Sequence, residues 1–206
     1  MSAPLLYVVS APSGGGKTSL VNALLERDRS VALSISHTTR APRPGEIDGV
    51  HYYFVDEATF DRLAAQGAFL EHALVFGYRY GTGRESVEAQ LAKGLDVLLD
   101  IDWQGARQIR DSFPAVRSIF ILPPSLDELR RRLVGRGQDS PEVIARRMEA
   151  ARAEISHAGE FNFLIVNDEF EAALADLHAI IRQGHPVRDQ QNVNSREILA
   201  HLLETG

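Results

Sequence analysis

The stretch "VVSAPSGGGKTSLVNALL", residues 8–25, decides the fold because it joins an apolar run to a helix-like segment through three consecutive glycines. Residues 11–18 fit the pattern A-x-x-x-x-G-K-T, which departs from the usual phosphate-loop pattern only at Ala11, where glycine is common. Glycine-rich backbone can turn its N–H groups toward a phosphate, and the following helix presents its positive end to the same anion. We therefore predict a strand, a phosphate-binding loop and a helix.

The side chains of this loop suit a nucleoside triphosphate. Lys17 can reach the β and γ phosphates, and Thr18 can offer its hydroxyl to Mg²⁺. We expect a backbone conformation at Ala11 that needs no glycine. The alternative is a glycine-rich turn that caps a helix without binding a ligand. The residues of this segment expected to border the nucleotide are Ala11, Pro12, Ser13, Gly14, Gly15, Gly16, Lys17, Thr18 and Ser19.

Composition restricts the class of protein. The 206 residues, 44% of them hydrophobic, can form one sizeable domain. The net charge of -6 argues against sequence-independent nucleic-acid binding, and the absence of cysteine excludes disulfides and thiolate chemistry. The N-terminal segment has no basic region or long apolar run, which predicts a cytoplasmic protein without a membrane segment. A homo-oligomer is compatible with the sequence.

Short apolar runs alternate with amphipathic segments, which predicts an α/β fold with a central parallel sheet flanked by helices. The runs are residues 5–9, 31–36, 95–101, 116–122 and 161–166. Ser125 and Glu128 predict a capping box at the start of one helix, and Ser140 followed by Pro141 predicts the start of another. Seven histidines show no metal-ligand spacing, so we expect them to be structural or exposed.

Residues 35–84 are aromatic-rich and contain short strand and turn signals, so we predict an insertion here. Ala41 and Arg43 each precede a proline, and residues before proline favour an extended or polyproline conformation. A stiffened loop of this kind would project the guanidinium groups of Arg40 and Arg43 from one side. Paired arginines suit a phosphate dianion, although a solvated basic loop is the alternative. Tyr52 and Tyr80 could donate hydroxyl bonds to that phosphate, or be ordinary strand aromatics.

Glu71 places one carboxylate in the apolar run "AFLEHALVF". A carboxylate that faces a cavity can accept from the adjacent N1–H and N–H₂ donors of guanine, a pair that adenine lacks. The alternative is a solvent-facing strand charge. Thr82 could assist with its hydroxyl, although "TGRE" also predicts a capping box for a helix from Arg84. Ser36 could contact the base carbonyl.

The run "VLLDID" ends in two acids, Asp100 and Asp102. Carboxylates at such a strand end can orient Mg²⁺ or its water ligands. If the strand continues, both side chains point to the same face, so both are metal candidates together with Thr18. A strand-terminating turn without a metal is the alternative.

Taken in order along residues 5–183, several blocks resemble guanylate kinases: "SAPSGGGKTS", "SISHTTRAPRPGEIDGVHYYFV", "FLEHALVFGYRYGT", "LLDIDWQGA", "FILPPSLDELRRRLVGRG" and "IVND". The resemblance implies one P-loop kinase domain over residues 1–206. Its core would span about residues 1–34, 85–131 and 158–206, with a GMP-binding insertion at about 35–84 and a helical lid at about 132–157.

The resemblance also implies substrates and roles. ATP, with Mg²⁺, and GMP would give ADP and GDP by direct in-line transfer, with dGMP as a further acceptor. The GMP site would comprise Ser36, Arg40, Arg43, Tyr52, Glu71, Tyr80, Thr82 and Asp100. The catalytic cations would be Lys17, Arg40, Arg132, Arg136 and Arg147. Arg136 and Asn167 would complete the ATP site. Thr82 stands where many members have serine, and it keeps the hydroxyl.

Two rival functions are open at this point. The first is a kinase of the same fold that acts on another nucleoside monophosphate or a sugar phosphate, which Glu71 and Thr82 argue against. The second is a phosphopeptide-binding scaffold, since guanylate-kinase-like modules also serve that role. Such scaffolds typically degrade the ATP site, whereas Lys17 and its neighbouring hydroxyl are present here.

Overall fold

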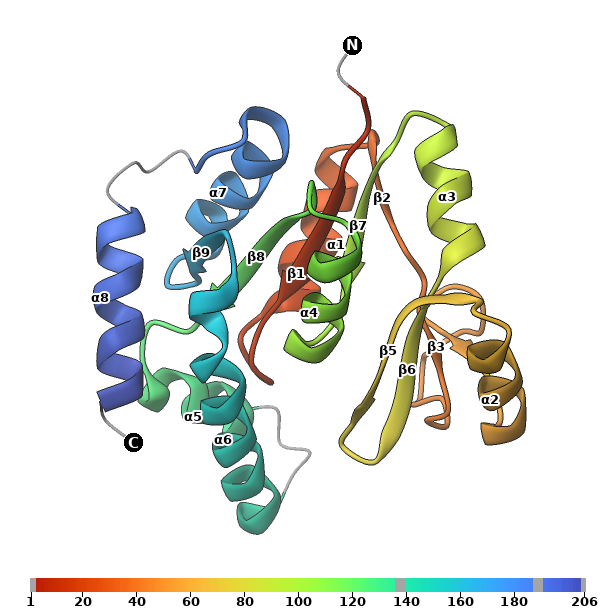
Figure 1. Ribbon diagram of the computed structural model, residues 1–206. Coiled ribbons are helices and arrows are strands. Elements are labelled where there is room, and N and C mark those ends of the chain that lie inside the picture. Colours follow the sequence, from red (N-terminus) through yellow and green to blue (C-terminus); the bar gives the residue numbers. More distant parts are fainter. Residues whose placement is uncertain (1–2, 136–139, 187–190, 205–206) are drawn as a thin grey trace. The chain divides into compact units, whose positions relative to one another are not determined.

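The computed structural model describes residues 3–135, 140–186 and 191–204, with the backbone alone for residues 191–194 (Figure 1). The chain forms two compact units. The first unit is Met1–Val8 with Arg29–Val116, and the second is Val9–Asp28 with Arg117–Gly206. The α/β prediction is confirmed, because helices flank a five-stranded sheet in the order β2-β7-β1-β8-β9. Its strands are β1 (Leu6–Ser10), β2 (Val31–Leu33), β7 (Asp96–Asp100), β8 (Arg117–Leu122) and β9 (Phe163–Val166).

The central strands are buried on both faces, as continuous apolar runs predict. Every residue of β1 is buried, and the middle of β7 and nearly all of β8 are closed to solvent. β2 and β7 pair in parallel, as do β8 and β9. The predicted run over residues 31–36 is shorter as a strand, since only Val31–Leu33 pairs with β7 before the chain enters a second sheet at His37–Thr38.

The first unit also holds a four-stranded sheet in the order β4-β3-β6-β5. Its strands are β3 (His37–Thr38), β4 (Tyr53–Phe54), β5 (Phe69–Val75) and β6 (Tyr78–Gly83). The antiparallel pair β5 and β6 closes through Phe76 and Gly77, both with positive φ, 50° and 82°. Two positive φ values are the signature of a type I′ turn, whose twist matches a hairpin. The helices of this unit are α2 (Glu57–Ala65), α3 (Arg84–Ala92) and α4 (Trp103–Ser112).

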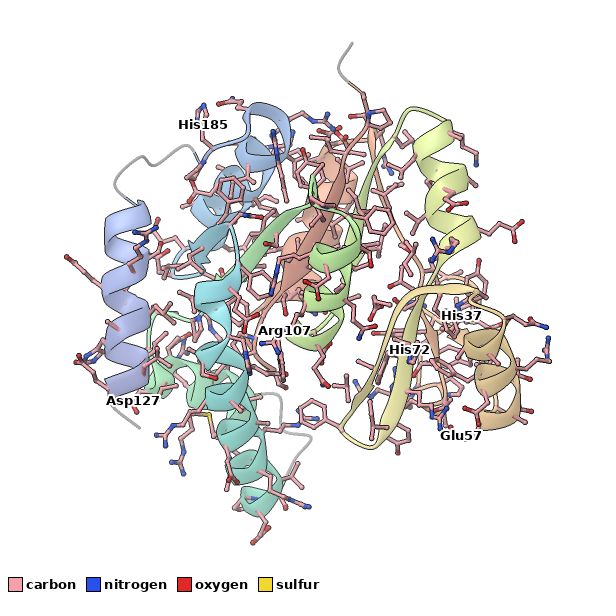
Figure 2. All side chains as sticks on the ribbon, in the orientation of Figure 1. His37, Glu57, His72, Arg107, Asp127 and His185 are labelled. Carbon is pink, nitrogen blue, oxygen red and sulfur yellow. The ribbon has the colours of Figure 1, made fainter. Side chains whose placement is uncertain are left out.

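β5 is an edge strand, and glutamine side chains from α4 cover part of its free edge. Gln108 donates from Nε2 to the His72 carbonyl at 2.9 Å and accepts from the His72 N–H at 3.2 Å (His72 is labelled in Figure 2). Gln104, one turn earlier, donates to the Leu74 carbonyl at 3.4 Å. The Gln108 amide thus reproduces the two bonds that a neighbouring strand would make, and β5 is fixed to α4.

The second unit carries five α-helices within its described residues. They are α1 (Lys17–Arg27), α5 (Leu126–Gly135), α6 (Pro141–Ser156), α7 (Phe170–Gln183) and α8 (Gln191–Glu204). A short 3-10 helix, η1 (Ala158–Glu160), follows α6. α5 buries Leu126, Leu129 and Leu133, the apolar stripe expected of an amphipathic helix. Across the part of the chain that the structure describes, no helix combines the length and apolar character needed to cross a membrane.

The predicted helix starts meet different outcomes. Ser140 caps α6, with Pro141 in its first turn, as predicted. Ser125 accepts from the Glu128 N–H at 3.1 Å, which is half of the predicted capping box, while the Glu128 carboxylate binds arginines instead. The capping box predicted at Thr82 is wrong, because α3 has Gly83 at its N-cap and no side-chain cap bond.

One ionic cluster ties the end of α1 to α7. Asp28 Oδ2 accepts from His178 Nε2 at 2.9 Å and from Arg182 Nε at 2.5 Å. Asp28 is 13% exposed and both partners are about one-third exposed, so solvent screens the cluster in part. Since α1 follows the phosphate loop, this cluster holds the far end of the helix on which the loop rests.

We expect Asp28→Asn to lower the free energy of unfolding by about 1 kcal/mol, because a partly screened charge loses two charge-assisted partners. Urea denaturation at low and high salt measures the change, and salt should reduce it. Asp111→Asn, at an exposed position of α4, is the matched control and should change stability by less than about 0.5 kcal/mol. Equal effects of the two variants would contradict the assigned contact.

Candidate functional site

The phosphate loop follows β1 and leads into α1. Gly14 and Gly16 have φ values of 91° and 92°, in the left-handed region that favours glycine. Gly16 is the N-cap of α1, which therefore begins at Lys17. Among the described residues, Phe76 is the only non-glycine residue with positive φ, so Ala11 lies outside that region. This geometry agrees with the expectation that position 11 needs no glycine.

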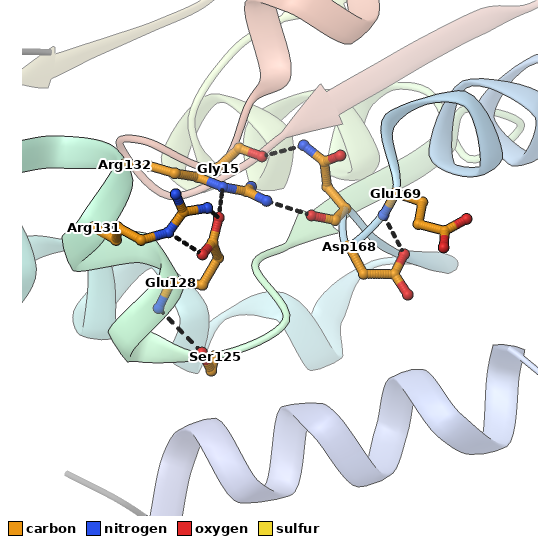
Figure 3. Close-up of polar contacts among 8 residues, drawn as sticks. Gly15, Ser125, Glu128, Arg131, Arg132, Asp168 and Glu169 are labelled. Atoms are coloured by element: carbon orange, nitrogen blue, oxygen red, sulfur yellow. Dashed lines mark hydrogen bonds and ion pairs between the residues drawn. The ribbon is translucent and has the colours of Figure 1, made fainter. Parts of the chain in front are cut away.

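The rest of the second unit holds the loop's backbone in place (Figure 3). The Gly15 N–H donates to the Pro12 carbonyl at 2.8 Å, and the Gly15 carbonyl accepts from Asn167 Nδ2 at 2.9 Å. The Asn167 amide packs so closely that a Cβ built on Gly16 would lie 2.3 Å from its nitrogen. Asn167 therefore fixes the turn and leaves no room for a side chain at Gly16.

A second support for the loop comes from α6, and no sequence pattern predicts it. The Ser13 N–H donates to Glu154 Oε2 at 3.0 Å, so α6 contributes a carboxylate to the loop backbone. Ser13 and Glu154 lie 141 residues apart, which places this contact beyond the reach of any local pattern. Only the tertiary structure could reveal it.

Arg132, predicted as a catalytic cation, is held by two acceptors at the edge of the loop. Its Nε donates to Glu128 Oε1 at 2.7 Å, and its Nη2 donates to the Asn167 carbonyl at 2.9 Å (Figure 3). Hydrogen bonds from Arg131 and Arg132 lower the pKa of Glu128 to about 2, so that carboxylate stays ionised near neutral pH. Arg147 is half-buried in α6, and Arg136 lies outside the described residues.

In the first unit, Glu71 is a buried carboxylate on β5. It is 3% exposed, and Thr82 donates its hydroxyl to Glu71 Oε1 at 2.6 Å from the paired position on β6. Burial raises the pKa of Glu71 to about 7, against the hydrogen bond from Thr82 and with a smaller contribution from the Asp102 charge. The structure therefore places Glu71 and Thr82 together and keeps Glu71 out of solvent.

The first turn of α4 packs against this carboxylate. A Cβ built on Gly105 would lie 2.3 Å from Glu71 Oε2, so glycine is required for the present position of the side chain. Asp102 is the N-cap of α4, where Oδ1 accepts from the Gly105 N–H at 2.9 Å and Oδ2 from Gln104 Nε2 at 3.0 Å. The condition under which Asp100 and Asp102 would share one face of a strand is not met, because β7 ends at Asp100.

The predicted phosphate-binding residues lie in different surroundings. Arg40 is 8% exposed, and its guanidinium lies 5.4 Å from the centre of the Tyr52 ring. The Tyr52 and Tyr80 ring centres are 5.9 Å apart, so these three side chains form one group. Arg43 is exposed in the loop that follows. Ser36, predicted to contact the base carbonyl, is buried immediately before β3.

Comparison with known proteins identifies the class. The family model for guanylate kinase matches residues 4–184. A guanylate kinase of Alkalilimnicola ehrlichii is 60% identical over 198 residues, covering 96% of this chain and 98% of that protein. One of Haemophilus influenzae is 56% identical over 206 residues, covering 98% and 99%. The chain is thus a nucleoside monophosphate kinase.

The solved structures agree with the sequences. The crystal structure of guanylate kinase from Anaplasma phagocytophilum matches with a TM-score of 0.75 and 38% identity, covering 98% of this chain and 96% of that chain. The chain belongs to the guanylate kinase family.

We expect Gly105→Ala to lower the free energy of unfolding by about 1–3 kcal/mol, because the new Cβ would displace a buried carboxylate. An alanine with open space around it would instead stabilise a helix by up to about 1 kcal/mol, so the sign of the change is informative. Urea denaturation measures it, and Gly159→Ala, where a Cβ meets nothing within 4 Å, is the control.

Adding Glu71→Asp to Gly105→Ala should restore part of the lost free energy of unfolding, since the shorter side chain makes room for the new Cβ. Additive effects of the two substitutions would contradict the contact.

Proposed function

We propose that this guanylate kinase transfers the γ-phosphoryl group of ATP to GMP through two sets of residues, one in each unit. The observation that carries the proposal is the buried Glu71 carboxylate, which has one oxygen held by Thr82 and the other beside Gly105. A buried carboxylate is costly unless a ligand or a protein donor satisfies it. A base with two adjacent N–H donors meets that need.

The second unit would bind ATP. The glycine-rich backbone and the start of α1 favour an anion, and Lys17 adds a positive charge. The Ser13 and Gly15 N–H groups donate to Glu154 and Pro12 in this structure, so they are not counted among these donors. Asn167 and Arg132 support this role indirectly, because they fix the loop backbone. Thr18 is the second residue of α1 and is exposed, where its hydroxyl can serve a metal ion. The remaining loop residues, Ala11, Pro12 and Ser19, would border the same nucleotide.

The first unit would bind GMP. The Glu71 carboxylate would accept from N1–H and the exocyclic N–H₂ of guanine, while Thr82 keeps the carboxylate oriented. Adenine offers no such pair of donors, so its binding would leave the buried carboxylate unsatisfied. Ser36 would add a contact to the base carbonyl, and Asp100 is a further candidate contact for GMP. dGMP differs from GMP at the ribose alone, so we propose it as a second acceptor.

The phosphate of GMP would bind to Arg40, Arg43, Tyr52 and Tyr80. Arg40, Tyr52 and Tyr80 already form one group, which supports the assignment. A planar guanidinium can give two parallel hydrogen bonds to phosphate oxygens, and the tyrosine hydroxyls can each add one. Arg43, exposed on the loop, is free to turn toward the anion.

The oxygen donors on the chain suit Mg²⁺. Mg²⁺ keeps several water ligands and binds few protein groups besides the substrate phosphates, so a hydroxyl and one carboxylate are sufficient. Within the described ranges, no cluster of three or more acidic, histidine or cysteine side chains could hold a metal on its own. The Thr18 hydroxyl is the proposed hydroxyl donor, and the carboxylates of Asp100 and Asp102 are the two candidates for the acidic donor.

In the proposed reaction, a GMP phosphate oxygen forms a bond to the γ-phosphorus while the bond to the β,γ-bridging oxygen breaks, and ADP leaves. The attacking oxygen is already ionised near neutral pH, so no side-chain base is needed. Bound Mg²⁺ would supply charge neutralisation on the ATP phosphates. Lys17, Arg40, Arg132 and Arg147 would align the phosphates and offset the developing charge, together with Arg136 from outside the described residues.

The pKa of Glu71 predicts how binding depends on pH. The ionised form accepts from guanine, so affinity should fall as pH drops below about 7. We expect guanosine, which has no phosphate to titrate, to bind about tenfold more weakly at pH 6 than at pH 8. Calorimetric titration measures this affinity. Glu71→Gln should bind weakly with no such pH dependence, and a flat profile for the native protein would contradict the role of Glu71.

The same pKa has the opposite consequence for the unliganded fold. A raised carboxyl pKa means that the folded state binds more protons than the unfolded state between about pH 4.5 and pH 7. The stability contributed by protonated Glu71 is therefore present at low pH and is lost as pH rises through 7.

The acceptor specificity tests the proposal directly. ADP formation from Mg-ATP should be fast with GMP and slow with AMP, CMP and UMP, and Glu71→Gln should lower kcat/KM for GMP by about 100-fold or more. Glu57→Gln, an exposed change in the same unit, is the control. Equal turnover of another acceptor would favour a different monophosphate kinase. Mg-ATP binding that survives in Lys17→Ala would argue against the assigned loop.

A further inference from the structure

Glu46 contacts two of the residues assigned to the phosphate of GMP, Arg40 through its side chain and Arg43 through its backbone. As a carboxylate, Glu46 is not itself a ligand for an anion. Its Oε1 accepts from Arg40 Nη2 at 2.8 Å, and its Oε2 accepts from the Arg43 backbone N–H at 2.7 Å. One carboxylate therefore connects the Arg40 side chain to the backbone of the loop that carries Arg43.

This contact is largely removed from solvent. The Arg40 and Glu46 side chains are 8% and 18% exposed, so the ion pair is screened far less than a surface pair. The hydrogen bond from Arg40 is the main cause of the lowered pKa of Glu46, and the same bond raises the pKa of Arg40 above its usual range. Both groups are therefore charged throughout the neutral pH range.

Further contacts with aromatic rings and with the backbone hold the Arg40 guanidinium in place. It lies 5.4 Å from the centre of the Tyr52 ring and 5.9 Å from that of Phe54, both within the range of a cation–π interaction. Nη1 donates to the Ala41 carbonyl at 2.8 Å. The Arg40 Nε–H is buried and has no hydrogen-bond partner among the described residues.

We propose that Glu46 is a positioning residue for the acceptor phosphate. Its carboxylate holds the Arg40 side chain and the Arg43 backbone in the arrangement that receives the phosphate, so this part of the ordering is complete before the acceptor binds. The inference rests on the proposed function for the identity of the acceptor. Ordering a long cation in advance lowers the entropy lost on binding, which strengthens the affinity for the phosphate alone.

A carboxylate that blocks the phosphate site would have the opposite effect on the affinity for GMP. If the Glu46 carboxylate occupied the place of the phosphate, an incoming anion would have to displace it, and its removal would strengthen binding. The two roles predict changes of opposite sign in the affinity for GMP, so variants of Glu46 distinguish them.

The experiment compares Glu46→Gln and Glu46→Ala with the native protein in binding GMP and guanosine. We expect GMP to bind about tenfold more weakly to Glu46→Gln, and still more weakly to Glu46→Ala, which loses both acceptors. Guanosine should bind within about twofold of native, because it lacks the group that Glu46 serves. In turnover, KM for GMP should rise by a similar factor while kcat changes by less than about threefold.

The matched control is Glu57→Gln, which removes the same charge from an exposed partner of Arg79 in the same unit (Figure 2). It should change neither affinity. Tighter binding of GMP to Glu46→Ala, an equal loss for GMP and guanosine, or no change in either would each overturn the proposal. Native protein that does not turn over GMP would overturn the proposed function instead, so the two failures are distinguishable.

Discussion

The backbone of Gly15 connects the phosphate loop to the rest of the second unit. Its N–H closes a turn on Pro12, and its carbonyl accepts from the Asn167 amide. The backbone of Asn167 in turn binds Arg132, whose charge is paired with Glu128. The Asn167 amide thus fixes the turn through the Gly15 carbonyl, while the Ser13 and Gly15 N–H groups donate to Glu154 and Pro12.

A different constraint governs the first unit, where a carboxylate is buried beside a glycine. Keeping Glu71 out of water raises its pKa and weakens the unliganded fold near neutral pH. The same burial makes the carboxylate selective, since a base without paired donors cannot satisfy it. Stability and specificity are therefore opposed at one side chain, and Gly105 provides the space that allows this arrangement.

The parts of the fold that depend on local pattern could be predicted from the sequence. Buried strands, the glycine loop and the proline start of α6 follow from residues that are neighbours in the chain. The capping box at Thr82 failed because a distant partner competed with a local one, since Thr82 binds Glu71 on the paired strand rather than capping α3. Asp102 has a local role, because it caps α4 through the Gly105 N–H after β7 has ended. Gly105, Glu46 and Glu154 gave no signal, since their importance depends on atoms that only the fold brings to them.

The glutamines of α4 have a consequence for encounters between copies of the chain. An edge strand usually presents unpaired N–H and carbonyl groups, on which another polypeptide can build a further strand. At His72 both groups are already bound by the Gln108 amide, and the Leu74 carbonyl is bound by Gln104. The edge of β5 from His72 to Leu74 is therefore protected against the addition of a strand from another molecule in the crowded cell.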